Sequence, residues 1–160
     1  MIDNNILNRL FNLLGKSERD LDLIKLLNEL KICQPLPRPD KDTGDLLLEE
    51  EVEGIYLGFN NFEDLVRYNN SINLMEGELI FTSISIIDGN LFKKYKLPLG
   101  LELEMMFVDI IEKFGEPEWK RSYDNAYRWE VEGLKVLLEF DDENKYLLRV
   151  NYQIPQEFHF

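Results

Sequence analysis

Thirty-one aspartate and glutamate side chains supply most of the reactive groups in this chain. Paired carboxylates can act as general acid and base in glycoside hydrolysis, and larger groups of them bind cations. Here the acids are abundant, but their spacing defines neither kind of site. The sequence also lacks a nucleophile elbow, a phosphate-binding loop, an HExxH motif and a Cys/His cluster. We therefore predict no catalytic residue, no metal and no cofactor, and we expect that the protein is not an enzyme.

One segment approaches the pattern of a calcium-binding loop. Asp40, Asp42 and Glu51 occupy the first, third and twelfth positions of an EF-hand. However, Gly44 stands at the fifth position, where a ligand is required, and Asp45 stands at the sixth, where glycine is required. Three prolines just upstream also disfavour the entering helix. The pattern favours an acidic turn.

The chain has one cysteine and one histidine, Cys33 and His159. A single cysteine forms no intramolecular disulfide, which fits a reducing compartment, and neither residue has the neighbours that a nucleophile or a metal ligand needs. The N-terminal sequence starts with an acid and lacks the features of a signal peptide, and no apolar run reaches the ~20 residues of a membrane span. These features predict a cytoplasmic protein without a membrane partner.

The formal net charge of −13 is concentrated in three stretches. Residues 40–53 carry −6, and residues 102–118 and 130–143 each carry −5. Such a charge repels nucleic acid and anionic membranes and attracts cationic proteins. The three lysines near residue 94 form too small a basic cluster to reverse this conclusion. A solvated surface and a binding surface for a cationic partner are both compatible with the pattern.

Two of these acidic stretches contain six of the eight predicted partner-binding residues. Alternation along a strand would place three glutamates on one face, and an acidic loop would follow a second hairpin. Two aromatic residues beyond the third helix are candidate anchors of an interface. By contrast, Trp129 alternates with charged neighbours and is expected in the core. The candidate binding residues are Glu49, Glu51, Glu53, Trp119, Tyr123, Asp141, Asp142 and Glu143.

Hydrophobic periodicity predicts an α+β fold, an antiparallel meander sheet with helices packed on one face. The sequence Ser17–Asp20 resembles a capping box at the start of the second helix. Gly115 and Pro117 mark the end of the third. The first two expected helices cover residues 4–14 and 17–32. The third lies within residues 97–119, with Phe107, Val108, Ile111 and Phe114 on its apolar face. The expected strands cover 46–52, 55–59, 78–87, 126–131, 134–140 and 146–154.

The sequence Glu-Val-Glu-Gly occurs at residues 51–54 and again at 130–133. Each copy separates two predicted strands, and each hairpin follows an amphipathic helix that ends at glycine, Gly15 or Gly115. We interpret the chain as one domain, residues 1–160, with a possible tandem pseudo-repeat in halves 1–90 and 91–160. Chance similarity between two α+β segments is the alternative.

Four short motifs give the chain a resemblance to small bacterial immunity proteins, the antidotes to polymorphic and contact-dependent toxins. They are Leu14-Gly15-Lys16, Gly54-Ile55, Leu97-Pro98-Leu99-Gly100-Leu101 and Gly115-Glu116-Pro117. The resemblance spans most of the chain, and all four motifs concern structure.

The resemblance implies stoichiometric inhibition of a cognate toxin C-terminal domain. A cationic nuclease would suit an acidic inhibitor, which can mimic the phosphate backbone and associate quickly. No binding residue is transferred from the family, and the resemblance leaves the oligomeric state open. The alternative is a non-catalytic protein-interaction module with an unrelated partner.

Overall fold

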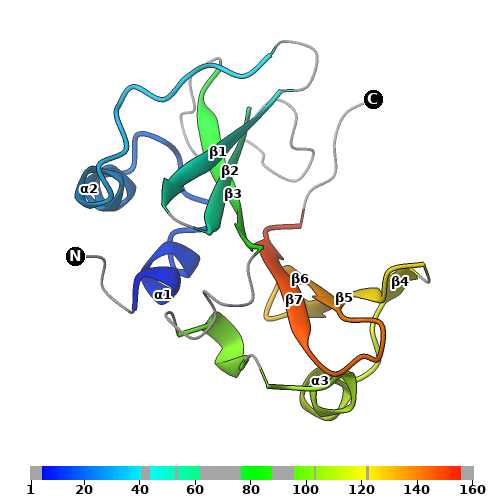
Figure 1. Cartoon of the computed structure of the whole chain (residues 1–160). Coiled ribbons are helices and arrows are strands. Elements are labelled where there is room, and N and C mark those ends of the chain that lie inside the picture. Colours follow the sequence, from blue (N-terminus) through cyan, green and yellow to red (C-terminus); the bar gives the residue numbers. More distant parts are fainter. Residues whose placement is uncertain are drawn as a thin grey trace.

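The chain forms a seven-stranded antiparallel sheet with helices against one face (Figure 1). This computed structural model describes residues 5–40, 44–52, 54–61, 77–87, 96–102, 104–121 and 123–155, and only the backbone of residues 49–52. The strand order is β1-β2-β3-β7-β6-β5-β4. The strands are β1 (Asp45–Val52), β2 (Ile55–Asn61), β3 (Leu79–Ile86), β4 (Trp119–Arg121), β5 (Ala126–Val131), β6 (Leu134–Phe140) and β7 (Leu147–Gln153).

The predicted α+β antiparallel meander is confirmed. Strands that follow one another in the chain are paired, with one exception: β3 pairs with β7 and not with β4. The helices are α1 (Ile6–Phe11), α2 (Leu21–Glu29) and α3 (Phe107–Phe114), with a short 3-10 turn, η3 (Pro98–Gly100), before α3. Figure 1 shows α1 and α2 beside the half of the sheet that contains β1–β3, and α3 beside β5–β7. No helix of the described ranges has the length and apolar character needed to cross a membrane.

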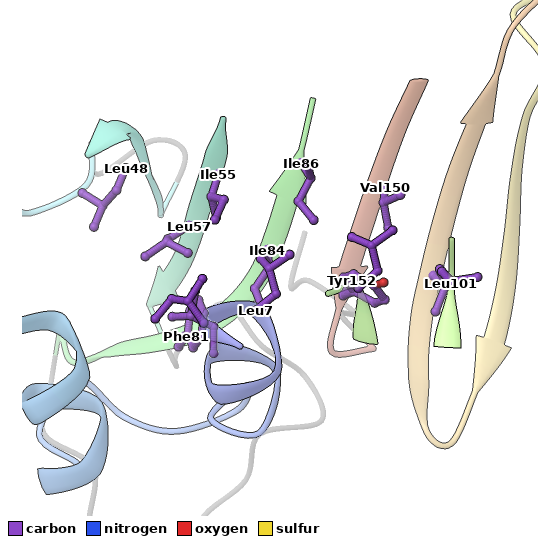
Figure 2. Packing of buried hydrophobic residues seen from close by; sticks show 14 of the residues in the cluster. Leu7, Leu48, Ile55, Leu57, Phe81, Ile84, Ile86, Leu101, Val150 and Tyr152 are labelled. Atoms are coloured by element: carbon purple, nitrogen blue, oxygen red, sulfur yellow. The ribbon is translucent and has the colours of Figure 1, made fainter. Parts of the chain in front are cut away.

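A continuous row of apolar side chains crosses six strands on the face that the helices cover. The cross-strand partners in this row are Leu48, Leu57, Ile84, Tyr152, Val136 and Trp129. All six are at most 6% exposed, and they join the helix residues Leu7 and Ile110 in one hydrophobic core. Figure 2 shows Leu7 of α1 directed at the sheet residues of this core. Because successive side chains of a strand point to opposite faces of the sheet, the residues between those of this row lie on the opposite face.

The two halves of the chain meet at the β3–β7 pair. On that line Ile84 pairs with Tyr152, and the Asn151 side chain donates a 2.6 Å hydrogen bond to the Ser85 hydroxyl. The Tyr152 hydroxyl donates a 2.8 Å hydrogen bond to the Pro98 carbonyl oxygen, which attaches η3 to β7 beside the β3–β7 pair. Burial raises the pKa of this hydroxyl, so it remains a donor. The β1–β2–β3 and β5–β6–β7 meanders therefore form one sheet, but the tandem pseudo-repeat stays a hypothesis.

The second helix begins later than its sequence predicts. Asp20 is its N-cap, and its carboxylate accepts hydrogen bonds from the amides of Asp22 and Leu23 at 3.0 and 3.1 Å. The predicted capping serine, Ser17, instead pairs with β3 and donates to the buried Glu78 carboxylate at 2.6 Å. Pairing with the sheet holds residues around Ser17 in an extended conformation, so the helix starts only after them.

Candidate functional site

Two turns that are distant in sequence lie side by side at one end of the sheet. The first joins β4 to β5 and includes Tyr123–Asn125, and the second joins β6 to β7 and comprises Asp141–Tyr146. The Asn125 side chain donates to the Asp141 carbonyl oxygen at 3.0 Å, and the Phe140 amide donates to the Asn125 carbonyl oxygen at 3.1 Å. We call these two turns, with the adjacent Trp119 and Arg121 of β4, the paired-turn surface.

The paired-turn surface unites five of the eight predicted binding residues. Tyr123 is 82% exposed, and Tyr146, which sequence reasoning missed, is 57% exposed. Asp142 and Glu143 are also exposed at the tip of the second turn. The exposed tyrosines provide apolar contact area, and the carboxylates beside them provide negative charge.

The Asp141 carboxylate forms its hydrogen bonds within its own turn. Its carboxylate accepts hydrogen bonds from the amides of Lys145 and Tyr146 at 2.7 and 3.2 Å. Asn144 follows with a φ of 58°, a left-handed conformation that asparagine tolerates better than most residues. The turn is thus shaped by Asp141 and Asn144, while Asp142 and Glu143 face solvent. Glu143 forms an exposed 2.8 Å ion pair with Lys145, a kind of contact that contributes at most about 1 kcal/mol.

Trp119 of the edge strand β4 lies between two arginines. The guanidinium carbons of Arg121 and Arg128 are 5.8 and 5.4 Å from the centre of its ring. Trp119 is 37% exposed and lies opposite Arg128 on β5, on the face away from the core. Its counterpart Trp129 is 2% exposed in the core, as predicted. The two tryptophans therefore have different roles, one in the core and one at the surface.

Carboxylates hold these arginines in place. Arg121 donates to Asp124 through Nε at 2.7 Å, and Arg128 donates to Glu118 through Nε at 3.0 Å. Lys135 also donates to Glu118, at 2.8 and 2.9 Å, and this contact, with that of Arg128, lowers the pKa of the Glu118 carboxyl. The bond from Arg121 lowers the pKa of Asp124 and raises that of Arg121 itself. Both carboxylates therefore stay ionised under mildly acidic conditions.

The three predicted glutamates of the first hairpin lie elsewhere. Glu49 and Glu51 belong to β1, the edge strand opposite β4, and their side chains, like all of Glu53, fall outside the described part of the structure. Four strand spacings of about 4.8 Å place β1 about 19 Å from β6. The β1–β2 and β6–β7 turns do share one end of the sheet, because Ile55, Ile86 and Val150 are consecutive partners. A single acidic interface would have to span this distance.

A second acidic surface lies on α3. Its open groove has a volume of about 440 Å³ and is lined by Glu102, Glu104, Met105, Asp109, Glu112 and Lys113. Asp109 is committed to the helix start, where it accepts from the Met106 amide at 2.8 Å. Sequence reasoning counted the charge of this stretch but nominated none of its residues. The (i, i+3) spacing of Asp109 and Glu112 was the available signal, since it places both on one helical face.

Within the residues that the structure covers, no three acidic, histidine or cysteine side chains group in a way that could hold a metal ion. No family model, curated protein or solved structure matches this chain. The functional conclusion therefore depends on the surface itself and on the resemblance of its motifs.

Proposed function

We propose that the chain is an immunity protein that binds a cognate bacterial toxin domain and neutralises it by stoichiometric inhibition. The observation that carries this proposal is the hydrogen-bonded pairing of the two turns, through Asn125 and Asp141. It brings exposed Tyr123 and Tyr146 onto the same surface as Asp142 and Glu143. Stoichiometric inhibition requires an exposed binding surface of this kind and requires no catalytic group.

The charge of the chain supports a cationic partner. With a net charge of −13, the protein attracts a positively charged domain over distances of about 10 Å at ordinary ionic strength. A toxin that acts on nucleic acid carries such a surface for the phosphate backbone, and an acidic protein that covers it blocks the substrate. We therefore infer that the target is a nuclease-type toxin domain and that the inhibitor acts in the cytoplasm.

Co-expression tests this function. A gene immediately upstream that encodes a large secreted protein with a variable C-terminal domain would favour this function, and that C-terminal domain would be the candidate toxin. The absence of such a gene would favour the alternative, an interaction module with an unrelated partner. We expect that wild-type protein restores growth to cells that express this domain and co-purifies with it at a 1:1 ratio. Failure in both respects contradicts the proposal and favours an interaction module with another partner.

A charge-reversal pair makes the test specific to the surface. The variant Asp142→Lys/Glu143→Lys is expected to lose protection, because both changed side chains face a cationic partner. The matched control Asp22→Lys/Glu29→Lys makes the same change in net charge on exposed positions of α2. The control is expected to protect. Equal loss in both variants would show that overall charge, and not the paired-turn surface, is responsible.

A further inference from the structure

Side chains of β4, of its partner strand β5 and of the turn between them form a continuous ladder of aromatic rings and guanidinium groups. The order is Arg128, Trp119, Arg121 and Tyr123, with guanidinium-to-ring distances of 5.4, 5.8 and 5.2 Å. Such distances lie within the range of cation–π attraction. Arg121 therefore contacts both exposed rings at once, although one belongs to the strand and the other to the following turn.

Each guanidinium is fixed from its other side. Asp124 binds Arg121 through two hydrogen bonds, and Glu118 binds Arg128. A planar guanidinium in a two-point contact has a defined orientation, so the rings beside it are restricted as well. Arg121, which makes the two-point contact, thus restrains two large side chains, Trp119 and Tyr123, before a partner arrives.

Pre-ordered aromatic side chains suit the centre of an interface. Binding usually costs conformational entropy as interface side chains become fixed, and residues already fixed in the free protein avoid part of that cost. Tryptophan, tyrosine and arginine are also the residues that most often dominate binding energy. The ladder itself has no excess of negative charge, since Asp124 is paired with Arg121, and Glu118 is shared by Arg128 and Lys135. In contrast, the neighbouring turn Asp141–Tyr146 has three acids and one lysine.

We propose that Trp119 and Tyr123 form the affinity-determining centre of the partner interface, with Arg121 as the positioning residue that orders both rings. This inference rests on the proposed function. Charge complementarity defines the occupant as a protein surface with an apolar centre, which covers the two rings, and a basic rim, which faces Asp142 and Glu143. The ladder then governs how long the complex lasts, whereas the acidic turn governs how fast it forms.

Binding kinetics of the purified toxin domain on immobilised protein test this division. Trp119→Leu and Tyr123→Leu are expected to increase the dissociation rate about tenfold or more and to change the association rate less than about threefold. Asp142→Asn/Glu143→Gln is expected to show the reverse pattern, with an effect that disappears at high salt. Tyr56→Leu serves as the control, because Tyr56 lies on the same face of the sheet in the distant strand β2.

The positioning role of Arg121 has its own readouts. Arg121→Met is expected to increase the dissociation rate, and Arg121→Met/Tyr123→Leu to increase it less than the product of the single effects, because both act through one ring. In the free protein, NMR relaxation is expected to show larger motion of the Trp119 indole N–H in Arg121→Met than in the wild type. An unchanged indole signal overturns the positioning role, with or without a partner.

The possible failures are distinguishable. If the wild type binds the toxin domain but Trp119→Leu and Tyr123→Leu dissociate at the wild-type rate, the inference is overturned and the proposed function stands. If the wild type does not bind at all, both are overturned. Thermal melts of every variant identify loss of folding, which is not expected because both rings are exposed.

Discussion

The indole Nε1 of Trp129 donates a 2.8 Å hydrogen bond to the carbonyl oxygen of Gly115. This bond attaches the C-terminal end of α3 to the middle of β5, and the Trp129 ring packs against Phe114 of the same helix. Gly115 has a φ of 85°, a conformation in which any other residue would be strained. The helix end and the buried tryptophan therefore form one structural unit.

We expect Trp129→Phe to destabilise the protein by about 1–3 kcal/mol, because the smaller ring leaves a cavity and the Gly115 carbonyl loses its donor. Urea denaturation measures this change. Trp119→Phe is a matched control at the surface and is expected to cost less than about 1 kcal/mol. Equal losses in the two variants would contradict the assignment of Trp129 to the core and Trp119 to the surface.

The stability of the wild type relative to Glu118→Gln is expected to depend on pH. Contacts with Lys135 and Arg128 lower the pKa of Glu118 from its ordinary value of 4.5. A carboxylate whose pKa is lowered by folding stabilises the folded state above the ordinary value, and this contribution is lost as the pH falls through the lowered value. The difference in Tm between the two proteins should thus be constant from about pH 7 to pH 5 and shrink below that. A difference that persists unchanged to pH 3 would contradict the role of the charge.

Gly58 is expected to resist substitution because of its neighbour across the strand pair. A Cβ atom at this position would overlap the Ser83 hydroxyl oxygen. We expect Gly58→Ala to cost about 1–3 kcal/mol in chemical denaturation. Adding Ser83→Ala removes that oxygen and leaves the Ser83 Cβ at 3.4 Å, an ordinary contact, so the double variant should regain much of the loss. Simple addition of the two effects would show that the clash is not the cause.

The two acidic regions are expected to differ in their effect on association. Reversal of Asp142 and Glu143 should slow binding to the toxin domain steeply at low salt. Reversal of Glu49, Glu51 and Glu53 should also slow it, because the net charge of the whole protein steers the encounter. The effect per charge should be smaller, since three strands lie between β1 and β6. Stopped-flow rates at several salt concentrations measure both slopes. An unchanged rate after the β1 reversal would remove those glutamates from the interface.

The strands were predictable because two local signals coincide in them. Apolar residues recur in short runs along β5 and β6, and a glycine-containing turn separates the two strands. The observed bounds, Ala126–Val131 and Leu134–Phe140, are those predicted. The end of α3 was predictable for a similar reason, since Gly115 and Pro117 act locally. Strand β4 was missed because three residues show no periodicity. It becomes a strand only through its pairing with β5.

The candidate site was only partly predictable. Composition nominated the aromatic and acidic residues, and the structure adds which of them share a surface. That outcome depends on the Asn125–Asp141 hydrogen bond, a contact across 16 residues that no local pattern encodes. Similarly, the helix cap moved from Ser17 to Asp20 because Ser17 pairs with β3, which lies more than sixty residues away. Local sequence patterns identify helices and strands, whereas tertiary contacts decide which of their side chains lie close together.

The pairing of β3 with β7 has a consequence for synthesis. The bond between the Ser85 and Asn151 side chains joins residues separated by 66 positions. While a ribosome makes the intervening segment, β3 lacks the strand that covers its outer edge, and its backbone groups there are free to pair with another chain. Only when β7 has emerged can the sheet close. We therefore expect ribosome-bound intermediates that stop before β7 to bind chaperones more strongly than the finished protein.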